Sequence, residues 1–149
     1  MDDFKALIPK LEEWNNGKGI DVDSWLAFIG RYEEAIAYAR LFWPEFIEHD
    51  GCVFRALSFN EENYQSWLES TESNRVATQA VMNHIHIIDL FPNSSPPTIL
   101  QLNHLGQILF EIWKCKLARE FPGLEIEVEY HEGSEEDPYA YELTFFTAD

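Results

Sequence analysis

The sequence predicts an α+β fold of about five helices around a central helix, residues 99–120, packed on a small and mainly antiparallel sheet. Three observations lead to this prediction. Apolar residues recur at helical spacing over most of the first 120 positions, and the period changes to two after Gly123. A polar loop then separates two segments rich in strand-forming residues, which predicts a β-hairpin at the C-terminal end.

Length and composition predict a single globular domain over residues 1–149. A chain of 149 residues is of ordinary size for one hydrophobic core. Hydrophobic residues make up 46% of the chain and aromatic residues 15%, more than a disordered acidic chain carries. The acidic charge is therefore expected to lie on a folded body.

The N-terminal part is predicted to be helical. A short amphipathic helix is expected over Asp2–Trp14, followed by a boundary at Asn15–Gly19, where asparagine and glycine favour a break. Asp21 or Asp23 then caps a second helix that ends before Pro44. Its apolar stripe is expected to be buried. The stripe consists of Trp25, Ile29, Tyr32, Ile36, Ala39 and Trp43.

The middle of the chain is predicted as a strand followed by two helices. A short run of β-formers predicts a strand over Cys52–Leu57. Ser58, with a glutamate three residues later, is expected to cap the next helix. Ser73 or Asn74 is expected to cap a further helix that continues to Phe91, before a proline-rich loop.

The C-terminal part carries the clearest pattern. Thr98 and Gln101 form a predicted capping box for the helix Ile99–Glu120, which is apolar over more than half of its circumference. Two strands follow it, the second over Tyr139–Thr147. In the first strand, alternate residues predict one buried face. These residues are Leu124, Ile126, Val128 and Tyr130.

The stretch VMNHIHIID brings two histidines within two residues of each other. On the predicted helix, His84 and His86 point about 200° apart and cannot share one metal ion. His84 is then expected to be buried, and His86 half-exposed near Asp89. If the segment were a strand, both rings would lie on one face as a metal pair. A third ligand would then come from His49, His104 or a carboxylate elsewhere.

An alternative function is a small-ligand or metal-dependent enzyme with a histidine-lined pocket between two helices. Its predicted residues are His86, Asp89, His104 and Glu111. The chain carries no nucleophile elbow, glycine-rich phosphate loop, CxxC pair or HExxH motif. A non-enzymatic role is therefore favoured, no catalytic residue or metal ligand is assigned, and no cofactor is expected.

Charge predicts the class of partner. The chain has 27 acidic and 10 basic residues and a formal net charge of −17, which opposes binding to nucleic acid or to an anionic membrane. Acidic residues concentrate in the first C-terminal strand and in the loop after it. We expect this surface to bind a basic protein, in an immunity-protein-like, antitoxin-like or adaptor role. Its residues are Glu125, Glu127, Glu129, Glu132, Glu135, Glu136, Asp137 and Tyr139.

The cysteines and the N-terminal residues predict a cytoplasmic location. Cys52 and Cys115 lack the spacing of a metal knuckle or a redox pair, so both are expected to be buried thiols. The first residues are acidic where a signal peptide is basic, and no apolar run is long enough to span a membrane. The sequence does not specify an oligomeric state.

Overall fold

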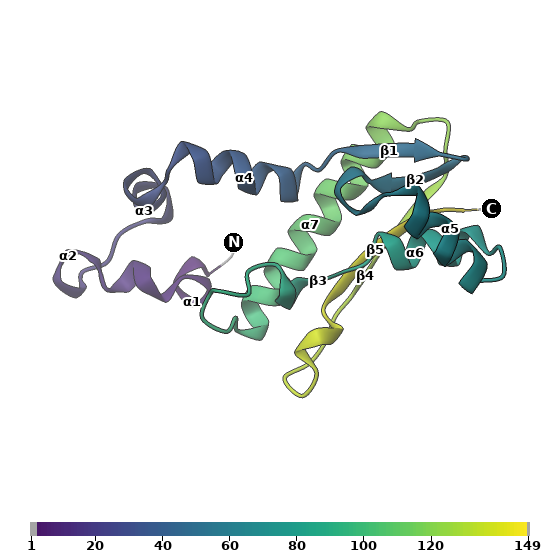
Figure 1. Ribbon diagram of the computed structural model, residues 1–149. Helices are drawn as coiled ribbons and strands as arrows, with labels where there is room; N and C mark the ends of the chain where they lie inside the picture. Colours follow the sequence, from purple (N-terminus) through teal and green to yellow (C-terminus); the bar gives the residue numbers. More distant parts are fainter. Residues whose placement is uncertain (1–2, 149) are drawn as a thin grey trace. The chain divides into compact units, whose positions relative to one another are not determined.

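The computed structural model describes residues 3–148. By its contacts the chain divides into two compact units, Met1–Ala39 and Arg40–Asp149. Figure 1 shows the order of the elements along the chain. Seven α-helices and two antiparallel sheets, of three and two strands, occur in the described part. This confirms the predicted α+β class.

The first unit begins with short helical turns. They are α1 (Phe4–Leu7), a 3-10 turn (Pro9–Glu12) and α2 (Trp14–Gly17). The predicted helix is thus interrupted at Ile8, before a proline that lacks an amide donor. Its expected start at Asp2 lies outside the described residues. The expected boundary after Trp14 is confirmed, because Asn15 and Asn16 both adopt positive φ angles within α2.

The prediction of one continuous second helix is wrong. Asp21 caps α3 (Val22–Ile29) by accepting a hydrogen bond from the amide of Ser24. Gly30 is extended, with a ψ of 146°, and α4 (Tyr32–Phe42) starts after it. The predicted stripe therefore does not form one face. Several of its members are exposed instead of buried, namely Ile29, Tyr32, Ile36 and Trp43.

A two-stranded hairpin opens the second unit. It pairs β1 (Phe46–His49) with β2 (Cys52–Arg55). The loop residues Asp50 and Gly51 have φ angles of 52° and 73°, as a two-residue type I′ turn requires. The predicted strand at Cys52 is confirmed as far as Arg55, whereas β1 was not expected.

Two helices follow this hairpin. Asn60, not the predicted Ser58, caps α5 (Glu61–Ser70). Asn74 caps α6 (Arg75–Met82) as predicted. The expected continuation of this helix to Phe91 is wrong. The chain instead forms the short strand β3 (Ile85–His86) and a 3-10 turn (Ile87–Asp89).

The three-stranded sheet has the order β3-β5-β4. It contains β4 (Ile126–His131) and β5 (Glu142–Thr147), which form the predicted antiparallel hairpin. The helix α7 spans Ile99–Glu120, as the sequence predicts, and starts with the predicted capping box of Thr98 and Gln101.

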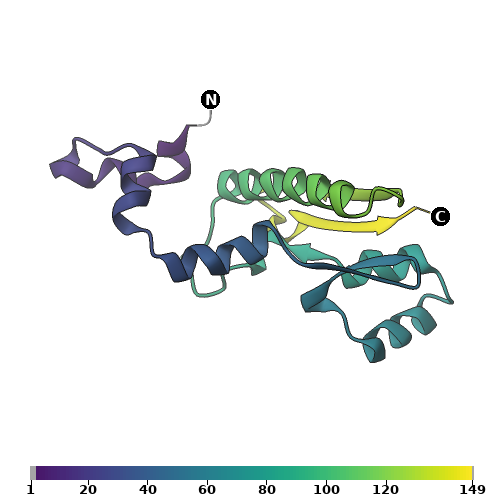
Figure 2. The same ribbon diagram turned by 90° about the horizontal axis from the view of Figure 1, so that it is seen from above.

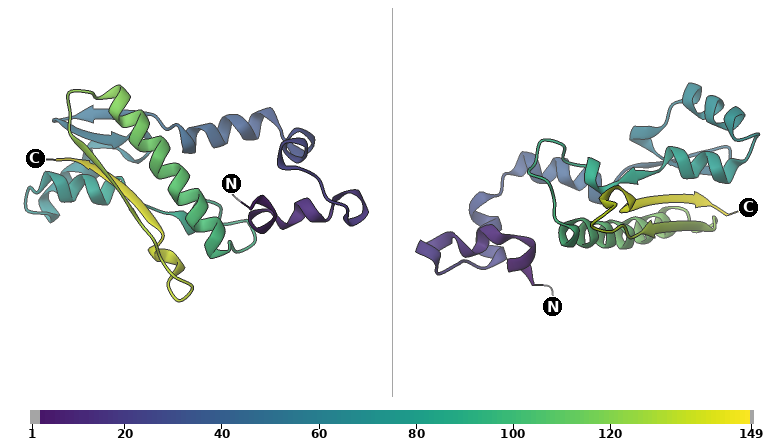
Figure 3. Two further views of the ribbon diagram at one scale, coloured as in Figure 1. Left: turned by 180° about the vertical axis from the view of Figure 1, so that it is seen from behind. Right: turned by 90° about the horizontal axis from the view of Figure 1, so that it is seen from below.

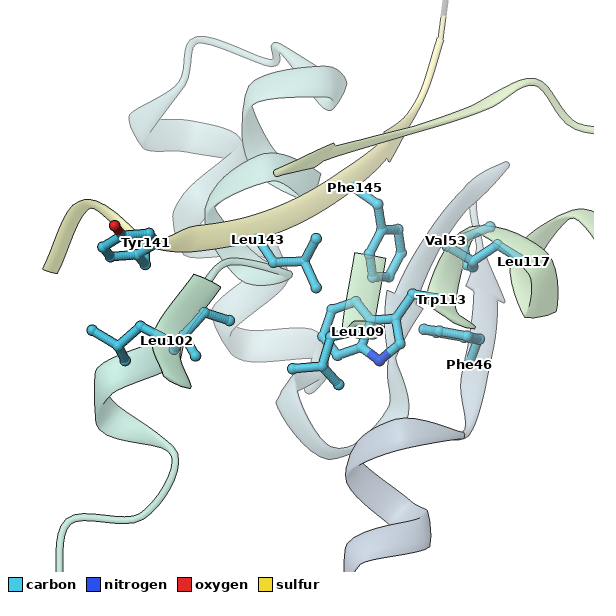
Figure 4. Packing of buried hydrophobic residues seen from close by; sticks show 10 residues of the cluster. Phe46, Val53, Leu102, Leu109, Trp113, Leu117, Tyr141, Leu143 and Phe145 are labelled. Carbon is cyan, nitrogen blue, oxygen red and sulfur yellow. The ribbon is translucent and has the colours of Figure 1, made fainter. Parts of the chain in front are cut away.

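The second unit is layered around β5. In Figures 2 and 3, α7 runs along one side of this strand, and α5 and α6 lie on the other side. Leu143 and Phe145 point from β5 toward α7, where Leu109 and Trp113 are fully buried (Figure 4). The indole of Trp113 also donates a hydrogen bond of 3.0 Å to the carbonyl of Leu41. The central helix and the sheet thus share one hydrophobic core.

Two buried amide side chains of α6 connect the two sheets. Gln79 accepts hydrogen bonds from the backbone amides of Val53 in β2 and Thr147 in β5. Asn83 donates to the carbonyls of Val53 and Phe145, at 2.9 and 3.1 Å. These side chains satisfy backbone groups that the two sheets do not pair with each other. The end of α6 is thereby held against both sheets.

The prediction of two buried thiols is half wrong. Cys52 is buried in β2, whereas Cys115 is exposed on α7.

None of the helices in the described part of the chain combines the length and the apolar composition needed to cross a membrane.

Candidate metal centre

His84 and His86 lie on one side of an extended segment. The amide of Asn83 still bonds to the carbonyl of Gln79, and the helix ends there. Beyond it, Ile85 pairs with Leu143 and His86 pairs with Glu142 of β5. Residues two apart in an extended chain share a face. The prediction that the two imidazoles point apart on a helix is therefore wrong.

Both histidines converge on one carboxylate. Nε2 of His84 lies 2.9 Å from Oε2 of Glu142, and Nδ1 of His86 lies 3.7 Å from the same oxygen. The two ring centroids are 4.5 Å apart. One ligand atom from each of the three residues can be chosen so that all lie within 4.8 Å of one another. This group, His84, His86 and Glu142, is the candidate metal centre.

The candidate metal centre is half-buried. About a third of each side chain is exposed, 31% for His84, 35% for His86 and 32% for Glu142. An ion can therefore reach it from solvent without opening the core. His86 matches its predicted half-exposure, whereas His84 is more exposed than predicted.

A backbone carbonyl orients the ring of His86. Nδ1 of this ring lies 2.7 Å from the carbonyl oxygen of Tyr139. A carbonyl only accepts, so Nδ1 carries the proton and Nε2 of the neutral ring keeps its lone pair. A metal at Nε2 preserves this bond, which is the usual outer-sphere arrangement of a histidine ligand. A metal at Nδ1 displaces it.

The spacing of the group suits a transition metal. In a tetrahedral zinc site with bonds of about 2.0–2.1 Å, neighbouring ligand atoms lie about 3.3 Å apart. The ligand atoms of the group lie within 4.8 Å of one another, and rotation about the χ angles of the three partly exposed side chains can bring them closer. Imidazole and carboxylate ligands together suit zinc and its neighbours in the first transition row.

Of the pocket predicted from sequence, the candidate metal centre includes His86. The group of residues identified within 3–148 contains neither Asp89, His104 nor Glu111. Asp89 and Glu111 are exposed, and His104 is half-buried on α7. The third ligand is instead a carboxylate on β5, which the strand interpretation of this segment left open.

The acidic surface predicted from sequence lies on β4, at one edge of the sheet, and in the loop that follows. Its residues are exposed except Glu129, which is half-buried, and 55% of Tyr139 is exposed. Glu127 and Glu129 alternate with Val128 and Tyr130, which pack against the core, as predicted. Binding of a partner by this surface stays a prediction.

Two residues near the centre were missed as functional candidates. Glu142 lies in a strand that the sequence predicts, but the pairing of that strand with β3 was not predicted. His131 was recognised only as part of the alternation in β4, yet it pairs with Glu142. The signal that could have indicated both is the strand interpretation of His84–His86, because a third strand would place imidazoles beside β5.

Comparison of this chain with protein-family models, curated proteins and solved structures gave no match.

Proposed function

We propose that this protein binds a divalent transition-metal ion of the zinc class through His84, His86 and Glu142. The observation that carries the proposal is the convergence of three ligand atoms within 4.8 Å of one another. Two imidazoles and one carboxylate form a ligand set used by zinc proteins. The formal net charge of −17 also favours the approach of a cation over that of an anion.

The test is a titration of the metal-free protein, purified without a histidine tag, with Zn²⁺ in a calorimeter. We expect one ion per chain, and a loss of affinity of at least about 10-fold in His84→Ala and in Glu142→Gln, because outer-sphere changes alone already cost that much. His104→Ala is the matched control, since this histidine lies on α7 outside the candidate metal centre.

Two results would contradict the proposal. One is the absence of stoichiometric binding by folded wild-type protein. The other is a loss of affinity in His104→Ala that His84→Ala does not share, which would favour the pocket predicted from sequence, because that pocket contains His104 and not His84. Circular dichroism of each variant shows whether it is folded, so that loss of metal binding is not confused with loss of the fold.

We also propose, as a second function, that the acidic surface binds a basic protein partner. The exposure of these carboxylates at the edge of the sheet, with the exposed ring of Tyr139, supports this proposal. Edge acids also deter association of strands.

Salt dependence and charge reversal test this second proposal. Partners captured from lysate at low and moderate salt are compared between wild type and the double variant Glu125→Lys, Glu127→Lys. This variant keeps Glu129, which forms an ion pair with His131. Glu33→Lys, Glu34→Lys makes the same change of charge on α4 and serves as the control. A stoichiometric basic partner that only the first variant loses would support the acidic surface. Equal capture of the partner by both variants would contradict this second proposal.

A further inference from the structure

A third histidine lies in the same row of the sheet as the candidate metal centre. Glu142, on the central strand, pairs with His86 of β3 on one side and with His131 of β4 on the other. Directly opposed residues place their side chains on one face, with Cβ atoms about 4.5–5.5 Å apart. His131 is therefore the cross-strand neighbour of Glu142.

The ring of His131 is free to turn. Its Nε2 lies 3.5 Å from Oε2 of Glu129, two residues away on the same face, and 59% of the side chain is exposed. An exposed ion pair of this kind contributes little free energy. Rotation about χ1 between staggered positions is therefore open to His131.

The face beside this row is not covered by α6. Thr144 lies two residues after Glu142 on β5 and is 8% exposed. Its hydroxyl donates a hydrogen bond of 2.6 Å to the carbonyl of Ala80 in α6. The helix ends at Met82, and Glu142 remains 32% exposed. The side chains of the row that holds His86, Glu142 and His131 are thus partly open to solvent, with exposed fractions of 35%, 32% and 59%.

We infer that His131 turns from Glu129 to become the fourth ligand, so that His84, His86, His131 and Glu142 enclose one ion. This inference rests on the proposed function and adds a coordination class to it. Four protein ligands leave no position for water, as in structural zinc sites. The ion links all three strands of the sheet, including β3, which has only two residues.

Cobalt and nuclear magnetic resonance test this inference on the full chain. Co²⁺ bound to wild type should show the intense visible absorption of tetrahedral coordination. His131→Ala should weaken that absorption and lower the affinity for Zn²⁺ by at least about 10-fold. In wild type, Zn²⁺ should shift the ring ¹⁵N resonance of one His131 nitrogen to that of a metal-bound imidazole.

Glu129→Gln is the matched control, because it removes the ionic partner of His131 and leaves the ring in place. It should bind Zn²⁺ as tightly as wild type or more tightly. An unmoved His131 resonance, with the loss of binding confined to His84→Ala and Glu142→Gln, would overturn the inference and leave the three-residue centre. Two ions per chain, one of them lost in Glu129→Gln, would overturn it in favour of a second site. No binding by wild type would overturn the proposed function and, with it, this inference.

Discussion

Gly106 leaves the space on α7 that the ring of Tyr130 fills. A Cβ atom at position 106 would lie 2.6 Å from Cζ and 2.7 Å from the hydroxyl oxygen of Tyr130. That hydroxyl donates a hydrogen bond of 2.8 Å to Oδ1 of Asn103, which holds the ring in place. A glycine within a helix, unfavourable by intrinsic propensity, is thus explained by a cross-element contact.

Gly106→Ala is expected to destabilise the protein by about 1 kcal/mol. Overpacking costs about 2 kcal/mol, and the better helix propensity of alanine offsets about half of it. Urea unfolding at equilibrium measures the difference. In the background Tyr130→Ala, where the ring is absent, the same change should stabilise. Stabilisation by Gly106→Ala in wild type would contradict the contact.

Burial, with Glu132 and Tyr141 nearby, raises the pKa of Tyr130 to about 12. In the unfolded chain a tyrosine titrates at about pH 10. Between these values the folded protein keeps a proton that the unfolded chain loses, so stability is complete below about pH 10 and is lost as pH rises toward 12. The free energy of unfolding should fall more steeply between about pH 10 and pH 12 in wild type than in Tyr130→Phe. Equal slopes would contradict the raised pKa.

At the scale of elements, tertiary contacts decide where α6 ends. Its pattern of apolar residues continues toward Phe91, but the side-chain amide of Asn83 forms hydrogen bonds with backbone groups of β2 and β5. The backbone beyond Asn83 then pairs with β5 as β3. The two histidines change from opposite faces of a helix to one face of a strand, and this change creates the candidate metal centre.

Asn83→Ala is expected to cost at least about 3 kcal/mol, because the amide of Arg55 and the carbonyls of Val53 and Phe145 lose their partner in a buried place. Thermal and urea unfolding measure the loss. Asn63→Ala, at an exposed position of α5, is the matched control and should change stability by less than about 0.5 kcal/mol. Similar losses in both variants would show that the hydrogen bonds of Asn83 to β2 and β5 contribute nothing specific to stability.

At the scale of the whole molecule, the buried hydrophobic residues are distributed unevenly between the two units. Among the described residues, the first unit contributes Leu11 and the second contributes the rest of the buried core. The exposed apolar residues of α3 and α4 include Leu26, Phe28 and Tyr32. Local stability should therefore differ between the units.

Hydrogen exchange on the full chain tests this difference. Amides in the middle of α7 should exchange only on global unfolding, since Leu109 and Trp113 are fully buried. Amides of α3 should exchange many times faster, because this helix contains no buried residue. Equal protection of α3 and α7 would contradict the expectation and would indicate that a partner or a second copy covers α3.

The sequence by itself determined the elements whose signals are local. The capping box and long apolar pattern of α7, the alternation in β4 and the acidic surface could all be read from neighbouring residues, because period and capping depend on the chain within one or two turns. The Asp50-Gly51 turn was equally local, although its hairpin was not predicted. Tertiary structure alone decided that α6 stops at Met82 and that His84, His86 and Glu142 meet. The physical reason is that pairing with β5, and the buried amides that direct it, join residues almost 60 positions apart, and these contacts outweigh local helix propensity.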